Sequence, residues 1–122
     1  MSGAYDFIQQ CGTFFLSTVN EGLPAVRPFG AIMEYAGELY FSTANTKDVY
    51  RQLLKNPAVQ IVATKPKSRQ WIRIRGSAIE VENLDAKQAM LDICPVLLKH
   101  FDTKECSNFA LFKIADMVST FH

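Results

Sequence analysis

The sequence lacks a strong excess of charge of either sign, and it lacks a long apolar run. Thirteen basic against twelve acidic side chains leave a net charge of +1, so the whole molecule offers no strong attraction to nucleic acid or to an anionic membrane. No apolar run approaches the roughly 18 residues of a spanning helix, and the N-terminus has no basic region followed by a long apolar core. We therefore expect a cytoplasmic protein with no nucleic-acid or membrane partner and with only local anion sites.

Cysteine and histidine are scarce and scattered. Cys11, Cys94 and Cys106 are odd in number and form no Cys-x-x-Cys pair, which argues against a disulfide framework and a structural zinc site. His100 and His122 have no histidine or cysteine partner at ligand spacing, as a metal site would require. We expect reduced thiols and no metal site.

The known signatures of self-sufficient catalysis are also missing. The chain has no nucleophile elbow, Walker loop or Gly-x-Gly-x-x-Gly fingerprint. Tyr50, His100 and Glu34 can titrate, but nothing in the sequence places them at a reaction centre, so the catalytic residues stay unknown. Any chemistry is expected to come from a bound cofactor, which the protein orients and desolvates.

The composition present is that of one globular domain. The 122 residues are 48% hydrophobic and 20% charged, which is typical of a folded chain, and domains cluster around roughly 100–150 residues. We expect a single domain over residues 1–122. No repeats or low-complexity segments interrupt it.

Strand patterns dominate the chain. Turn residues and apolar alternation predict strands over 13–19, 24–35, 39–42, 58–64, 71–81 and 109–121, with turns at 20–22 and 36–38. Helices are predicted over 4–10, 47–55 and 84–100; Gly12 ends the first, and the last begins at an Asp85 N-cap and breaks at Pro95. The helix over 47–55 buries a stripe that includes Leu54. The fold is therefore mainly β, a β-barrel with flanking helices.

A polar turn between a strand and a helix predicts an anion site. The strand ends at Phe41, a polar turn with three small hydroxyl residues follows over 42–46, and a helix opens at Lys47. Helix N-termini carry unpaired N–H donors and a partial positive charge, so the turn would cradle a phosphate. The alternative interpretation is an ordinary helix start with Thr46 or Asn45 as N-cap and Lys47 solvated.

The strand-like run 24–33 carries one arginine, two prolines and a glycine. Proline and glycine inside a strand mark edges, bulges or the close approach of a ligand. Arg27 either pairs with a carboxylate as a structural arginine or binds a phosphate bidentately. We expect the run to pair with the strand over 39–42 through the turn at 36–38, which brings Arg27 and Ser42 to one edge. An acidic Asp48 beside that edge must point away from a phosphate.

The order of these segments resembles the pyridoxamine 5′-phosphate oxidase-like family of flavin-binding split β-barrels. The likeness extends from about Phe7 to Phe121. It is carried by the ordered segments 27–30 (RPFG), 39–43 (LYFST), 47–53 (KDVYRQL), 56–59 (NPAV) and 71–78 (WIRIRGSA).

The resemblance implies a homodimeric split β-barrel that holds FMN at the subunit interface. The strand of Arg27 and the turn from Ser42 to Lys47 would grip the phosphate, the ring edge would face main chain over 28–31, and Trp71 would lie close to the flavin. The cofactor-binding residues implied are Arg27, Pro28, Phe29, Gly30, Phe41, Ser42, Thr43, Thr46, Lys47 and Trp71.

The implied activity is that of a flavin-dependent oxidoreductase, which passes electrons from a nicotinamide donor to an undefined small acceptor. The closer likeness is to the small, nitroimidazole-resistance-like branch. The true oxidase has a further C-terminal segment that contacts the pyridoxal ring, whereas this chain ends at His122. We therefore expect no pyridoxamine 5′-phosphate oxidase activity.

Two other functions remain open at this point. One is a barrel that binds flavin, heme or deazaflavin without turnover, which steady-state oxidation of NADH or NADPH distinguishes from an enzyme. The other is a nucleic-acid-binding barrel in which Trp71, Arg73 and Arg75 form a basic, aromatic platform. The near-zero net charge opposes this last function.

Overall fold

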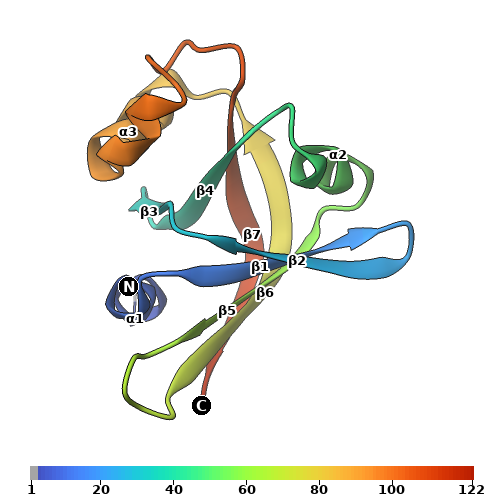
Figure 1. Cartoon of the computed structure of the whole chain (residues 1–122), viewed down its shortest axis with the longest axis vertical. Helices are drawn as coiled ribbons and strands as arrows, with labels where there is room; N and C mark the ends of the chain where they lie inside the picture. Colours follow the sequence, from blue (N-terminus) through green and yellow to red (C-terminus); the bar gives the residue numbers. More distant parts are fainter. Residues whose placement is uncertain (1–2) are drawn as a thin grey trace.

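The computed structural model describes residues 3–122, so residues 1 and 2 of the predicted domain lie outside the described residues. Within that range, seven antiparallel strands form one sheet that helices flank (Figure 1). In chain order the elements are α1 (Gly3–Cys11), β1 (Phe14–Asn20), β2 (Leu23–Phe29), β3 (Ile32–Tyr35), β4 (Glu38–Ala44), α2 (Asp48–Lys55), β5 (Ala58–Thr64), β6 (Trp71–Val81), α3 (Leu84–Ile93), the 3₁₀ helix η1 (Pro95–Lys99) and β7 (Phe109–Phe121).

The two edge strands of the sheet are neighbours in the chain. The strand order is β2-β1-β5-β6-β7-β4-β3, and only Gly30 and Ala31 separate β2 from β3. The sheet therefore curls until its edges meet. Within residues 3–122, β2 pairs with β1 and β3 pairs with β4, and no ladder joins the two edges. This is the split β-barrel with flanking helices that the sequence predicted.

Two short turns set the hairpins. Glu21 and Gly22 join β1 to β2 with φ angles of 52° and 81°, and Ala36 and Gly37 join β3 to β4 with the same pair of values. Positive φ at both central residues matches the right-handed twist of paired strands, which is why such turns favour glycine at the second place. Both predicted turns are confirmed.

The predicted pairing of the run 24–35 with the strand over 39–42 is confirmed for residues 32–35 but wrong for the part that carries Arg27. The run divides at Gly30, and only its second half, β3, pairs with β4, whereas Arg27 lies opposite Leu16 on β1. β2 is thus an edge strand. Pro24 and Pro28 have no backbone N–H, and at an edge this removes few of the hydrogen bonds between strands.

The N-cap predicted for α3 is wrong, and so are the caps that the alternative interpretation gave for α2. α3 begins at Leu84, but its N-cap is Asn83, two residues before Asp85, and the Asn83 side chain accepts a hydrogen bond from the backbone N–H of Ala86 at 3.0 Å. The N-cap of α2 is Lys47, which makes no side-chain cap bond. Asn45 lies outside α2, and its amide nitrogen donates to the carbonyl of Ser107 at 2.9 Å.

The stripe of buried apolar residues on the helix over 47–55 is narrower than predicted. Val49 and Leu53 are buried against the barrel, but Leu54 is 59% exposed. The break predicted at Pro95 is confirmed, since α3 ends at Ile93 and η1 begins at Pro95.

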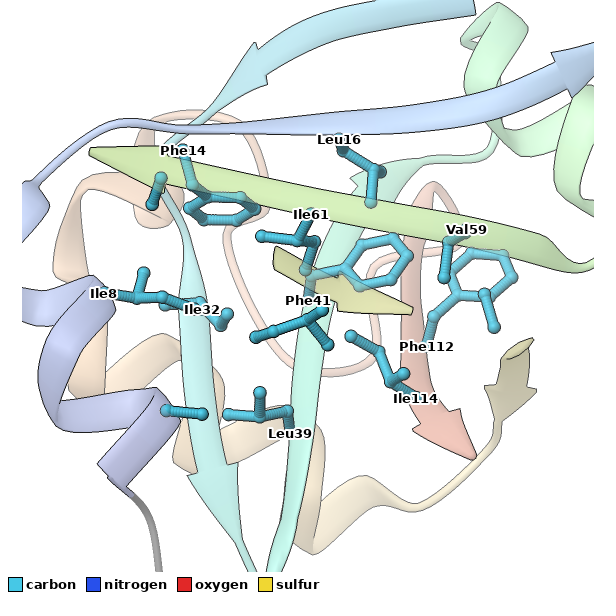
Figure 2. Packing of buried hydrophobic residues seen from close by; sticks show 14 of the residues in the cluster. Ile8, Phe14, Leu16, Ile32, Leu39, Phe41, Val59, Ile61, Phe112 and Ile114 are labelled. Atoms are coloured by element: carbon cyan, nitrogen blue, oxygen red, sulfur yellow. The ribbon is translucent and has the colours of Figure 1, made fainter. Parts of the chain in front are cut away.

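Aromatic side chains fill the barrel and link strands that share no ladder. The ring of Phe14 lies 6.0 Å from that of Phe29, Phe29 lies 5.8 Å from Phe41, and Phe41 stacks on Phe112 at 5.5 Å. Figure 2 shows Phe14, Phe41 and Phe112 among the core residues. Because Phe29 ends β2 and Phe41 lies on β4, the contact between them fixes the two strands relative to each other.

Candidate functional site

A cavity of about 890 Å³ lies where β2 and β4 end, between α2 and the segment that follows α3. Its volume is within the roughly 300–1,000 Å³ range typical of small-molecule and cofactor pockets. In Figure 1, α2 and the orange segment after α3 stand on opposite sides of the upper end of β4. Eight of the ten predicted cofactor-binding residues line the cavity: Arg27, Pro28, Phe29, Gly30, Ser42, Thr43, Thr46 and Lys47.

The other two predicted residues do not line it. Phe41 is fully buried in the core, where it positions Ser42 without facing the cavity. Trp71 begins β6 near the C-terminus, at the end of the barrel away from α2 (Figure 1), and its ring stacks on His122 at 4.0 Å. A single chain therefore does not bring Trp71 to this cavity.

Arg27 points to the inner face of the barrel under α2. Nη1 donates to the carbonyl of Leu16 at 3.2 Å and to Oγ1 of Thr18 at 2.9 Å, and Nη2 donates to Oε1 of Gln52 at 2.9 Å. No carboxylate within residues 3–122 forms a salt bridge with Arg27, so the alternative of a structural ion pair does not hold. Burial lowers the pKa of Arg27 from its ordinary value, and the more distant charge of Asp48 opposes this shift.

The N-terminus of α2 adds donors at the same place. Lys47 is the N-cap without a side-chain cap bond, so no side chain of the turn satisfies the first N–H groups of the helix, which carry partial positive charge. Asp48, which was expected to point away from an anion, instead lines the cavity, where it pairs with Arg51 at 2.7 Å. Both of these side chains are exposed, so the pair reduces the local negative charge but contributes little to stability.

Ser42 carries a buried hydroxyl with no partner. The residue is 5% exposed, and its Oγ has no hydrogen bond within residues 3–122. Buried polar groups are normally paired, and an unpaired one often marks a functional place. Because Ser42 lines the cavity, a ligand oxygen or nitrogen there would supply the missing partner. Glu34 holds the other unpaired buried atom, Oε2, but Glu34 is not part of the cavity wall.

The far wall of the cavity was not predicted. It consists of Val96, Leu97, His100 and Phe101, which come from η1 and the residues just after it. Helical spacing over 84–100 indicated buried positions but not which of them would face the end of β4. The sequence also missed Gln52, whose helix position gave no sign that it reaches the guanidinium of Arg27.

Of the three titratable candidates, only His100 lines the cavity. The hydroxyl of Tyr50 donates to Oε1 of Glu80 at 2.8 Å, and this bond raises the pKa of Tyr50 above its ordinary value. Tyr50 is therefore committed to a structural hydrogen bond between α2 and β6.

The described chain, residues 3–122, contains no helix long and apolar enough to cross a membrane. In the same range, no three or more His, Cys, Asp or Glu side chains are grouped so that they could hold a metal ion. Cys11, Cys94 and Cys106 are free thiols.

Comparison with known proteins gives one consistent family over most of the chain. The family model described as pyridoxamine 5′-phosphate oxidase matches residues 4–114. A NimC/NimA family protein from Clostridium acetobutylicum has a similar structure, with a TM-score of 0.92 and 34% identity over 98% of this chain and 84% of that one. No curated protein is similar enough in sequence to add to this comparison.

More distant structures share the fold. General Stress Protein 26 from Bacillus anthracis has a TM-score of 0.77 at 22% identity, covering 97% of this chain and 93% of its own. HutZ, the heme storage protein from Vibrio cholerae, has a TM-score of 0.72 at 18% identity, covering 93% of this chain and 89% of its own.

The unpaired hydroxyl of Ser42 predicts opposite effects on stability and on binding. In the ligand-free protein, Ser42→Ala should raise the free energy of unfolding by about 1 kcal/mol, because it removes a desolvated polar group that has no partner. The same change should weaken any ligand that uses the hydroxyl. Urea unfolding checks the stability, with Ser119→Ala, on the partly exposed part of β7, as the control. A loss of stability in Ser42→Ala alone would show that the hydroxyl is already paired.

Proposed function

Since this chain belongs to the pyridoxamine 5′-phosphate oxidase family, we propose that its cavity binds FMN and that the protein is a flavin-dependent oxidoreductase. The electrons would pass from a nicotinamide donor to a small acceptor. When bound, FMN supplies the hydride and electron transfer, and the protein orients it and excludes water.

One observation carries the proposal: the charge of Arg27 is held at the cavity by neutral acceptors only. A half-buried cation without a counter-ion is unfavourable unless an anion completes the site. The neighbouring wall offers the unpaired Ser42 hydroxyl, the exposed ammonium of Lys47 and the start of α2. This set of donors fits the dianionic phosphate of FMN, which accepts several charge-assisted hydrogen bonds.

The remaining walls suit the rest of the cofactor. Arg27 and Lys47 would hold the phosphate charge, and Ser42, Thr43 and Thr46 would donate hydroxyl hydrogen bonds. Main chain over 28–31 and the apolar side chains of Val96, Leu97 and Phe101 offer flat and apolar surface for a ring system. Cofactor pockets typically combine a few fixed polar groups with such apolar walls.

We also propose that the protein is a homodimer with the flavin at the interface. The outer face of the sheet exposes two large apolar side chains on the paired strands β1 and β2: Phe15 is 47% exposed and Val26 66%. Neighbouring exposed apolar groups of this kind are typical of interaction surfaces. In such an arrangement Trp71, remote from the cavity of its own chain, would serve the partner's site.

The dimer predicts a mass in solution of twice 13.7 kDa. Sedimentation equilibrium at micromolar concentration, with and without FMN, measures it directly. A monomer under both conditions would contradict the shared site and would leave Trp71 without a role at the flavin.

Heme is a second candidate ligand, because His100 lines the cavity beside Val96, Leu97 and Phe101. A single histidine in an apolar pocket is the usual axial ligand of heme iron, and HutZ, a heme storage protein, has the same fold. His100→Ala should abolish heme binding, whereas FMN binding should survive this change, because the phosphate donors lie on the opposite wall.

The visible absorption spectrum of the protein purified without added cofactor distinguishes the candidates. We expect a flavin spectrum, and mass spectrometry of the material released by heat should identify FMN. A Soret band instead would favour heme. A colourless protein that also fails to bind FMN on titration would refute the proposal.

Removing either cation should weaken FMN at least about tenfold, since a hydrogen bond to a charged group contributes about 1.5–3 kcal/mol. The variants are Arg27→Ala and Lys47→Ala, and flavin fluorescence titration measures the Kd. Lys55→Ala, at the exposed C-terminal end of α2, is the matched control and should bind like the wild type. Unchanged affinity in folded Arg27→Ala and Lys47→Ala would show that the phosphate lies elsewhere.

A further inference from the structure

Arg27 belongs to a closed hydrogen-bond network with two neutral residues. Oγ1 of Thr18 accepts from Nη1 of Arg27 at 2.9 Å and donates to Oε1 of Gln52 at 2.6 Å. The same Oε1 accepts from Nη2 of Arg27 at 2.9 Å. Thr18 comes from β1, Arg27 from β2 and Gln52 from α2, so the network joins three elements at the edge of the cavity.

The network decides which edge of the guanidinium is free. A guanidinium has five N–H donors. Both donors of Nη1 and one of Nη2 are taken by Leu16, Thr18 and Gln52. Thr18 and Gln52 are bonded to each other, so they occupy the end of the group between Nη1 and Nη2. Within residues 3–122, Nε and the second hydrogen of Nη2 keep no partner, and these two form the side edge that binds two oxygens of a phosphate in parallel.

We propose that Thr18 and Gln52 are positioning residues, which hold the side edge of the Arg27 guanidinium toward the cavity for a phosphate group. Only the identification of that phosphate as part of FMN rests on the function proposed above. The geometry itself offers two parallel N–H donors to two oxygens of one anion, and the phosphate can belong to a flavin or to another phosphorylated ligand.

Thr18 and Gln52 are both neutral, and this neutrality matters for the binding of an anion. A carboxylate in place of Gln52 would accept the same two hydrogen bonds, but its charge would cancel that of Arg27 and leave less attraction for an anion. The amide orientation is fixed by the network, because only Oε1 can accept from both Thr18 and Arg27. Thr18 is 2% exposed, so water does not replace its hydroxyl when it is removed.

A purely structural latch between β1 and α2 is the competing interpretation. The two interpretations differ in what Gln52→Glu does. If the network only joins β1 to α2, the carboxylate should keep or strengthen that connection and leave ligand binding unchanged. If the network positions Arg27, Gln52→Glu should leave the stability of the protein unchanged but lower its affinity for phosphate. The comparison of FMN with riboflavin isolates this effect, because riboflavin lacks the phosphate.

The experiment measures Kd for FMN and for riboflavin by flavin fluorescence in the wild type, Gln52→Glu, Thr18→Val and Thr18→Ser. We expect Gln52→Glu and Thr18→Val to weaken FMN about tenfold or more and to leave riboflavin within about twofold. Thr18→Ser, which restores the hydroxyl, should recover most of the FMN affinity. Gln10→Glu, an equal charge change on an exposed residue of α1, is the control and should behave as wild type.

Inorganic phosphate provides a second readout that does not depend on flavin. Millimolar phosphate should raise the thermal unfolding temperature of the wild type, Thr18→Ser and Gln10→Glu more than that of Gln52→Glu or Thr18→Val at matched ionic strength. If the wild type binds neither flavin, the FMN proposal fails, and the phosphate shifts alone decide the role of Thr18 and Gln52. Equal loss of FMN and riboflavin, or a phosphate response in Gln52→Glu equal to that of the wild type, would overturn the positioning role.

Discussion

The contact between the rings of Phe29 and Phe41, 5.8 Å apart, holds together two strands that share no backbone ladder. β2 and β4 lie near opposite edges of the sheet, and the barrel closes between them through side chains. Arg27 lies two residues before the first ring, and Ser42 follows the second. The separation of the two groups that define the candidate anion site is therefore set by aromatic packing, which is dense and resists small displacements.

Three features that lower the stability of the fold lie in this same region. Arg27 is desolvated without a counter-ion, the hydroxyl of Ser42 is buried without a partner, and α2 begins without a side-chain cap. Each of these is unfavourable by itself. Proteins tend to keep such features where a ligand completes them, and here all three meet at one cavity that is large enough for a cofactor.

Much of the architecture could be read from the sequence because its signals are local. The strands over 58–64, 71–81 and 109–121 and both hairpin turns follow from alternation and from residues that favour positive φ. The N-caps of α2 and α3 could not be read in this way, since several adjacent polar residues compete for each cap.

The sequence by itself determined the kinds of residue available, the succession of strands along the chain and the turn that precedes α2. Only the tertiary structure decided that β2 would lie at an edge away from β4, that η1 would form the far wall of the cavity, and that Thr18 and Gln52 would hold Arg27. Thr18 and Gln52 lie 34 positions apart, and residue patterns act over a few positions. Contacts across such separations depend on how the sheet curls and closes, which the packing of the whole core determines.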